Sequence, residues 1–231
     1  LGYSDEKLIA LNREAVNFVK GLAEEFGSGI DHLLVCGSIG PRGDGYNVGQ
    51  AMTPEEAHSY PRLQADAFSS AGVDLIEAVT FNYSDEAIGI VKAAESAAIP
   101  VVISFTVETD GNLPSGEALK EAIQKTDRIT GNYPQYFMIN CAHPRHFVDM
   151  LKKDGTWKQR IKGIRANAST KSHAELDEST ELDAGDKIML AQGYLQIRQL
   201  LPELKVVGGC CGTDCAHVDQ ISEMLLAEAT I

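Results

Sequence analysis

Strand-like and helix-like segments alternate along this chain, and the alternation restricts its fold more than any other feature. Short apolar segments typical of buried strands occur at 32–39, 73–80, 99–106, 135–141, 161–168 and 204–209. Each is followed by a segment with the apolar spacing or the capping residues of a helix. Strands that alternate with helices pair in parallel through right-handed crossovers. The sequence therefore predicts an α/β fold, either a doubly wound open sheet or part of a (β/α)8 barrel.

Several helix boundaries carry distinct signals. The first helix is expected to begin near Asp5 and to end at Gly27. Thr53-Pro54-Glu55-Glu56 reads as a capping box, and Pro61 should interrupt the helix that this box opens. Later helices are expected to begin near Ser84, Ser115, His146, Gly185 and Asp214. No linker or repeat divides the sequence, so residues 1–231 are expected to form a single domain.

The charge balance excludes two classes of partner. The chain has 20 basic and 33 acidic residues, for a net charge of −13, which disfavours nucleic acid and anionic membrane surfaces. No apolar segment approaches the roughly 18–20 residues of a membrane-spanning helix, and the first residues lack signal-peptide character. We therefore expect a cytoplasmic protein whose partners are small molecules. Whether it acts as a homo-oligomer is left open.

Chemistry in either architecture belongs at the carboxyl ends of the strands, which share one rim of the sheet. Polar and thiol side chains gather at those predicted ends: Ser38, Glu77, Ser104, Asn140, Cys141, Asn167, Cys210 and Cys211. Cys141 lies at the end of the fourth predicted strand, and the Cys210-Cys211 pair lies at the end of the last. Three thiols far apart in the sequence are therefore expected to converge.

The cysteine pattern favours a metal over disulfides. Five cysteines is an odd number at low density, which is unlike a disulfide scaffold. Three thiolates with one open position suit a catalytic Zn²⁺, and a site of net charge −1 is better at holding an incoming thiol than at activating water. The expected chemistry is attack by sulfur. Cys36, inside a strand, and Cys215 are expected to be packing residues.

Two other readings of these residues stay open. All of the cysteines could be small apolar packing residues, since buried cysteine is common. His143 and His146, which follow Cys141 closely, could instead form a Cys-His metal site or a nucleophile pair. An unrelated α/β enzyme with Cys141 as its nucleophile belongs to this second reading.

A Gly-Gly-Cys-Cys motif with an upstream Asn-Cys pair is the most specific feature of the sequence. The first lies in Val207-Gly208-Gly209-Cys210-Cys211-Gly212-Thr213 and the second in Ile139-Asn140-Cys141. Four further segments contribute to the same resemblance: Gly37-Ser38-Ile39-Gly40-Pro41, Ile103-Ser104-Phe105-Thr106, Ser115-Gly116-Glu117 and Arg165-Ala166-Asn167-Ala168. Together they resemble the zinc-dependent homocysteine S-methyltransferase family over nearly the whole chain.

The resemblance implies a (β/α)8 TIM barrel with zinc held by Cys141, Cys210 and Cys211, which would be catalytic through the metal. It also implies that Glu77 occupies the place of a glutamate that helps to hold the amino acid substrate. Asn140 and Asn167 are candidate substrate-binding residues on weaker grounds.

The resemblance further implies a difference in length. Family members begin with two more βα units, and this chain starts at what resembles their second helix. About six of the eight βα units are therefore expected, in a fragment or a naturally shortened form, as an N-terminally incomplete homocysteine-binding domain. A remnant of this kind would expose two unpaired sheet edges.

The implied reaction is methyl transfer to the thiol of homocysteine, giving methionine. The donor would be S-methylmethionine, S-adenosylmethionine or betaine, each of which carries a cationic methyl-bearing centre. The alternative is a non-catalytic or degenerate thiolate–zinc or redox protein of the same fold.

Overall fold

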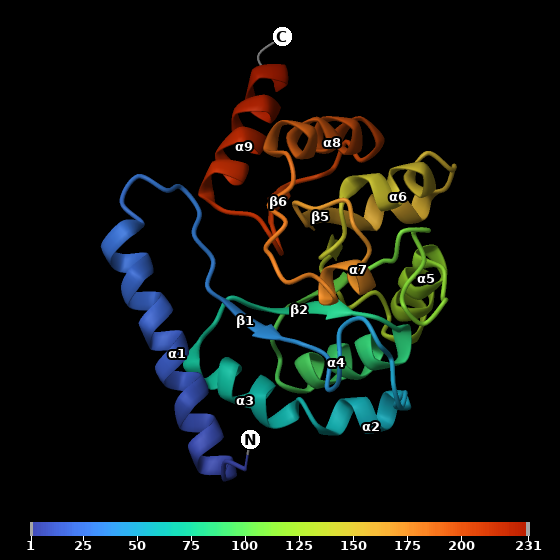
Figure 1. Cartoon of the computed structure of the whole chain (residues 1–231). Helices are drawn as coiled ribbons and strands as arrows, with labels where there is room; N and C mark the ends of the chain where they lie inside the picture. Colours follow the sequence, from blue (N-terminus) through green and yellow to red (C-terminus); the bar gives the residue numbers. More distant parts are fainter. Residues whose placement is uncertain (1, 230–231) are drawn as a thin grey trace.

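Six parallel strands form one curled sheet in the computed structural model, which describes residues 2–229 (Figure 1). The strands are β1 (Cys36–Ile39), β2 (Leu75–Phe81), β3 (Val101–Phe105), β4 (Phe137–Asn140), β5 (Ile161–Ala166) and β6 (Val206–Gly209). Their order in the sheet is their order in the chain, and every pair is parallel. A doubly wound sheet reverses its strand order at a switch point, whereas a barrel wall does not. The structure therefore confirms the TIM-barrel type, with six βα units.

Helices lie between the strands in the described part of the chain. They are α1 (Asp5–Phe26), α2 (Pro54–Ser59), α3 (Arg62–Ala71), α4 (Ser84–Ser96), α5 (Leu119–Ile129), α6 (Pro144–Leu151), the 3-10 helix η1 (Thr156–Arg160), α7 (His173–Asp177), α8 (Lys187–Leu200) and α9 (Cys215–Ala229). The capping box at Thr53 is present with both of its bonds, and Pro61 separates α2 from α3 as expected. Gly72 ends α3 in the left-handed conformation that favours glycine.

Several elements differ from those expected. The strands are shorter than predicted, and β1 begins at Cys36 instead of residue 32. The helix expected at Ser115 begins at Leu119, because the preceding residues form a turn closed by an isolated bridge between Asn112 and Ala118. The short helix α7 was not predicted, although Ser172 and Glu175 form a capping box at its start.

The core lies between the sheet and the surrounding helices. All five residues of β3 and all four of β4 are buried, as expected for strands covered on both faces. Phe81, Phe105 and Phe137 are among the largest fully buried side chains. Because these strands cannot shift without losing that packing, residues at their carboxyl ends are held in fixed positions.

The two edge strands are less covered than the centre. β1 and β6 are the outer strands among residues 2–229, and all four residues of β6 are half-buried. Beside β1, the helix α1 buries only Val16, while Phe18 and Phe26 are exposed. Within the same residues, none of the helices has the combination of length and apolar character that crossing a bilayer needs.

Tyr194 connects α8 to the last two strands. Its buried hydroxyl accepts a hydrogen bond from the Ala166 amide at 2.9 Å and contacts the carbonyl oxygen of Gly208 at 2.5 Å. We expect Tyr194→Phe to lower the free energy of unfolding by about 1–3 kcal/mol, because the buried Ala166 amide and the half-buried Gly208 carbonyl lose their partner. Urea denaturation measures this change. The matched control Tyr3→Phe, at an exposed position, should have no effect, and an equal loss in both variants would contradict the prediction.

Candidate metal centre

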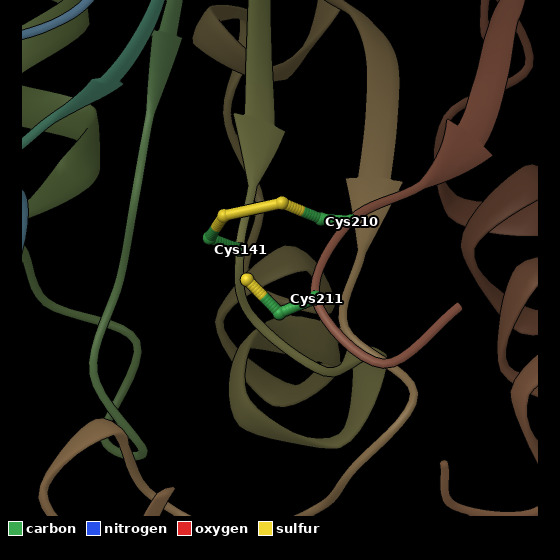
Figure 2. A group of neighbouring side chains, drawn as sticks. All are labelled: Cys141, Cys210 and Cys211. Carbon is green, nitrogen blue, oxygen red and sulfur yellow. A yellow bond between two sulfur atoms is a disulfide. The ribbon is translucent and has the colours of Figure 1, made fainter. Parts of the chain in front are cut away.

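Three cysteine side chains converge at the carboxyl ends of β4 and β6 (Figure 2). Cys141 follows β4, and Cys210 and Cys211 follow β6. Their sulfur atoms all lie within 4.8 Å of one another. Cys141 is buried, Cys210 is half-buried and Cys211 is exposed, so the cluster opens to solvent on the Cys211 side. The convergence predicted from the strand ends is confirmed.

Two of these cysteines are joined in the structure. Cys141 and Cys210 form a disulfide, with Cα atoms 5.5 Å apart, and Cys211 is free. A disulfide does not ligate zinc as a thiolate does, so this bond must be reduced before a metal can bind. In the reduced state the cluster offers three thiolates to one point and leaves one side open. This donor set fits a zinc site with three protein ligands.

The backbone at Cys141 is held in an unusual conformation. Cys141 has a φ of 54° and Thr80, across from it at the end of β2, has a φ of 63°. For a β-branched threonine this left-handed conformation is an outlier, and such strain clusters at functional sites. The Thr80 hydroxyl lies 3.9 Å from the Cys141 sulfur. The ends of β2 and β4 thus meet at Cys141.

Asn140 fixes that meeting point. Its side-chain oxygen accepts from the Thr80 amide at 2.9 Å and from the Ser104 hydroxyl at 2.6 Å. Its side-chain amide donates to the Thr80 hydroxyl at 2.8 Å. Because Asn140 and Ser104 are buried, a hydrogen-bond network of this kind restrains its members. Asn140 therefore ties the strand end that carries Cys141 to the adjacent strand β3 and to β2 beyond it.

Asn167 joins the two cysteine-bearing segments directly. Its side-chain amide donates to the carbonyl oxygen of Cys141 at 3.0 Å, and its side-chain oxygen accepts from the amide of Cys211 at 3.1 Å. Asn167 follows β5, which lies between β4 and β6. One buried side chain thus sets the separation of segments that are not adjacent in the sheet.

A close backbone approach shapes the turn at the cysteine pair. A Cβ atom at Gly209 would collide with the side chain of Thr213, whose hydroxyl donates to the carbonyl oxygen of Cys210 at 2.7 Å. Only glycine fits here, which gives the Gly-Gly-Cys-Cys motif a physical reason.

The histidines after Cys141 do not join the cluster. His143 caps α6, and its Nδ1 accepts from the Arg145 amide at 3.1 Å. Burial, with smaller contributions from His146 and Arg145, lowers the pKa of His143 to about 4, which keeps the ring neutral and able to accept. The His146 Nε2 contacts the carbonyl oxygen of Thr170 instead. Among the described residues, the group able to hold a metal here is the three cysteines alone.

Comparison with known proteins decides the family. The family model for homocysteine S-methyltransferase matches residues 1–225. The chain belongs to the homocysteine S-methyltransferase family. Homocysteine S-methyltransferase 1 of Arabidopsis thaliana is 24% identical over 234 residues, which cover 95% of this chain and 70% of that protein. The chain is therefore a member of an enzyme family that transfers methyl groups to homocysteine.

The fold is shared with a solved family member. The homocysteine methyltransferase MmuM from Escherichia coli has a TM-score of 0.72 in its metallated form and 0.73 in its oxidized form. Both are 18% identical, and the match covers 96% of this chain and 73% of MmuM. The sheet seen here is thus the wall of a methyltransferase TIM barrel.

Not every residue predicted for the family site lies at the cluster. Glu77 is in the middle of β2 and not at its end, because the strand continues to Phe81. Its buried carboxylate pairs with the Arg165 guanidinium at 3.2 Å. Cys36 and Cys215 were expected to be packed, but both are exposed: Cys36 because it begins an edge strand, and Cys215 because it begins α9 on the surface.

Thr80, Tyr46 and His173 were not predicted for the site. Thr80 is the last residue of the strand expected at 73–80, so the rule that strand ends carry chemistry could have identified it from the sequence. Tyr46 lies in the loop after β1 and His173 begins α7. Their positions depend on loop conformation, for which the sequence carries no periodic signal.

Proposed function

We propose that this chain is a zinc-dependent enzyme that moves a methyl group from a cationic donor to the thiol of homocysteine, giving methionine. The observation that carries the proposal is the convergence of three cysteine sulfurs within 4.8 Å on a rim of the barrel wall, in a member of a homocysteine methyltransferase family. The comparisons favour this enzyme over a non-catalytic protein of the same fold.

Cys141, Cys210 and Cys211 would hold the zinc through their thiolates. Bound zinc would lower the pKa of an incoming thiol and so supply a thiolate nucleophile at neutral pH. The protein contributes alignment, because the ligand segments are fixed by Asn140 and Asn167. Fixed geometry of this kind can lower a reaction barrier by about 7–11 kcal/mol. The metallated form of MmuM supports a metal role for this fold.

The methyl-transfer step consumes one thiol and one cationic donor. The homocysteine thiol releases its proton, and its sulfur then attacks the methyl carbon in line with the leaving group. The new sulfur–carbon bond forms as the donor's bond to that carbon breaks, and the donor leaves with its positive charge neutralised. S-methylmethionine, S-adenosylmethionine and betaine all fit this scheme.

The asparagines and Glu77 have separate proposed roles. Asn140 and Asn167, expected to bind substrate, serve the site by holding the cysteine segments. Glu77 would bind the ammonium group of homocysteine, exchanging its contact with the half-exposed Arg165. Because three free thiols are needed, we place the reaction in a reducing compartment such as the cytoplasm. Residues 1–231 would act as one homocysteine-binding domain.

Metal loading and turnover test the proposal together. After reduction under inert gas we expect one zinc per chain, and after oxidation less than a tenth of that amount, because the disulfide removes two ligands. The reduced, zinc-loaded chain should form methionine from homocysteine with at least one of the three donors. Zinc binding without turnover of any of the three donors would contradict the assignment as an enzyme. The absence of bound zinc would contradict the assignment of the metal centre.

A further inference from the structure

Two aromatic side chains from distant parts of the chain meet beside the sulfur cluster. Tyr46 lies in the loop that follows β1, and His173 is the first residue of α7 (Figure 1). Their ring centroids are 3.9 Å apart with a 33° angle between planes. Tyr46 is half-buried and His173 is buried. The loop after β1 and the α7 segment are thus in direct contact.

Tyr46 reaches the cluster through its hydroxyl. Burial raises the pKa of Tyr46, and the charge of the Cys211 thiolate and a hydrogen bond to that side chain raise it further. The Tyr46 hydroxyl therefore lies next to the Cys211 side chain. The backbone of Tyr46 is also fixed, because its amide donates to Asp44 Oδ1 at 2.7 Å. The Asp44 carbonyl oxygen in turn accepts from Asn82, just after β2, at 2.9 Å.

His173 reaches the other ligand segment. Its Nε2 lies 2.6 Å from the carbonyl oxygen of Cys141, and its Nδ1 lies 3.2 Å from Glu108 Oε1. A carbonyl oxygen can only accept, so Nε2 carries a hydrogen and donates it. Glu108 follows β3 and fixes the plane of the ring. The Cys141 carbonyl thus receives two bonds, one from His173 and one from Asn167.

We propose that Tyr46 and His173 are positioning residues of the thiolate centre. His173 holds the Cys141 segment through its carbonyl oxygen, and Tyr46 packs against the His173 ring with its hydroxyl next to Cys211, so the contact between the two rings links the two cysteine segments. Hydrogen bonds to ligands orient them for a metal, and losing such a partner typically costs about 10–100-fold in metal affinity. The proposal rests on the assignment of the three cysteines as zinc ligands.

Isosteric variants separate the hydrogen bonds from the ring contact. Tyr46→Phe keeps the ring against His173 and removes only the hydroxyl next to Cys211. His173→Phe keeps an aromatic ring but removes the donor to Cys141. Tyr133→Phe is the matched control, since its hydroxyl also donates one bond, to the Ile99 carbonyl at 3.1 Å, but outside the cluster.

Zinc affinity and a cobalt spectrum are the measurements, both on the reduced full chain. By competition with a chelator we expect zinc affinity to fall about 10-fold or more in each of Tyr46→Phe and His173→Phe, and to stay unchanged in Tyr133→Phe. With Co²⁺ in place of zinc, the sulfur-to-cobalt absorption band should shift or weaken in the first two variants. A general loss of stability would not move that band.

Two results overturn the inference. Wild-type zinc affinity and an unchanged cobalt band in both variants would show that neither residue positions the ligands. An equal loss of affinity in Tyr133→Phe would show that the effect is not specific to the cluster. Failure of the proposed function is recognised separately, because the wild-type chain would then bind no zinc or turn over no donor.

Discussion

Replacing Cys210 with alanine is expected to remove both the bound zinc and the methyl transfer. The side chain is one of three sulfurs that meet at the cluster, and no histidine of the described residues stands near enough to replace it. Loss of an outer hydrogen-bond partner already weakens metal sites by about 10–100-fold, so loss of a direct ligand should cost more than about 100-fold. Metal content after dialysis and the rate of methionine formation measure the two effects.

The other cysteines provide the control. Cys215→Ala removes an exposed thiol only five positions from Cys210, and Cys36→Ala removes an exposed thiol at the edge strand. Both variants should keep one zinc per chain and wild-type turnover. Zinc retained at full occupancy by Cys210→Ala would show that the ligand assignment is wrong.

Asn167→Leu should weaken the centre without touching a sulfur. Leucine has nearly the same size but can neither donate to Cys141 nor accept from Cys211. Because the buried Cys141 carbonyl loses one of its donors and the Cys211 amide loses its partner, we expect the free energy of unfolding to fall by about 1–2 kcal/mol. Zinc affinity should fall by about 10–100-fold because the two ligand segments are no longer held at a fixed separation. Urea denaturation and chelator competition measure these losses.

A second asparagine tests whether the effect is local. Asn12 in α1 also uses both ends of its side chain, donating to the Leu8 carbonyl and accepting from Gln64. Asn12→Leu should lower stability slightly and leave zinc affinity unchanged. If zinc affinity is the same in both variants, Asn167 is a structural residue and not part of the metal centre.

The fold and the convergence of the three cysteines could be predicted because both depend on strong local patterns. Six apolar segments separated by helical ones require parallel pairing, and parallel strands bring their carboxyl ends together. Cys141 and the Cys210-Cys211 pair were placed at those ends, and the structure brings them together. The pattern did not decide whether the sheet is a barrel wall or a doubly wound sheet, because that choice depends on the order of the strands in the sheet.

The rest of the site could not be predicted because it depends on loops and exact strand ends. Glu77 was assigned to a strand end, but β2 continues for four more residues. Tyr46 and His173 come into contact only because the loop after β1 and the helix α7 fold over the rim. Long-range contacts of this kind leave no periodic trace in the sequence.

The position of β6 at the margin of the sheet has a consequence for how the chain opens. Among the residues that the structure describes, this strand is bonded to β5 alone, yet the residues after it would share an ion with Cys141, two strands away. A metal bound by Cys141 and by the cysteines after β6 would link β6 to β4. Binding that stabilises the closed state makes local opening of β6 less frequent. Amide hydrogens of β6 and α9 should then exchange with deuterium more slowly once zinc is added, while those of β3 keep the same rate.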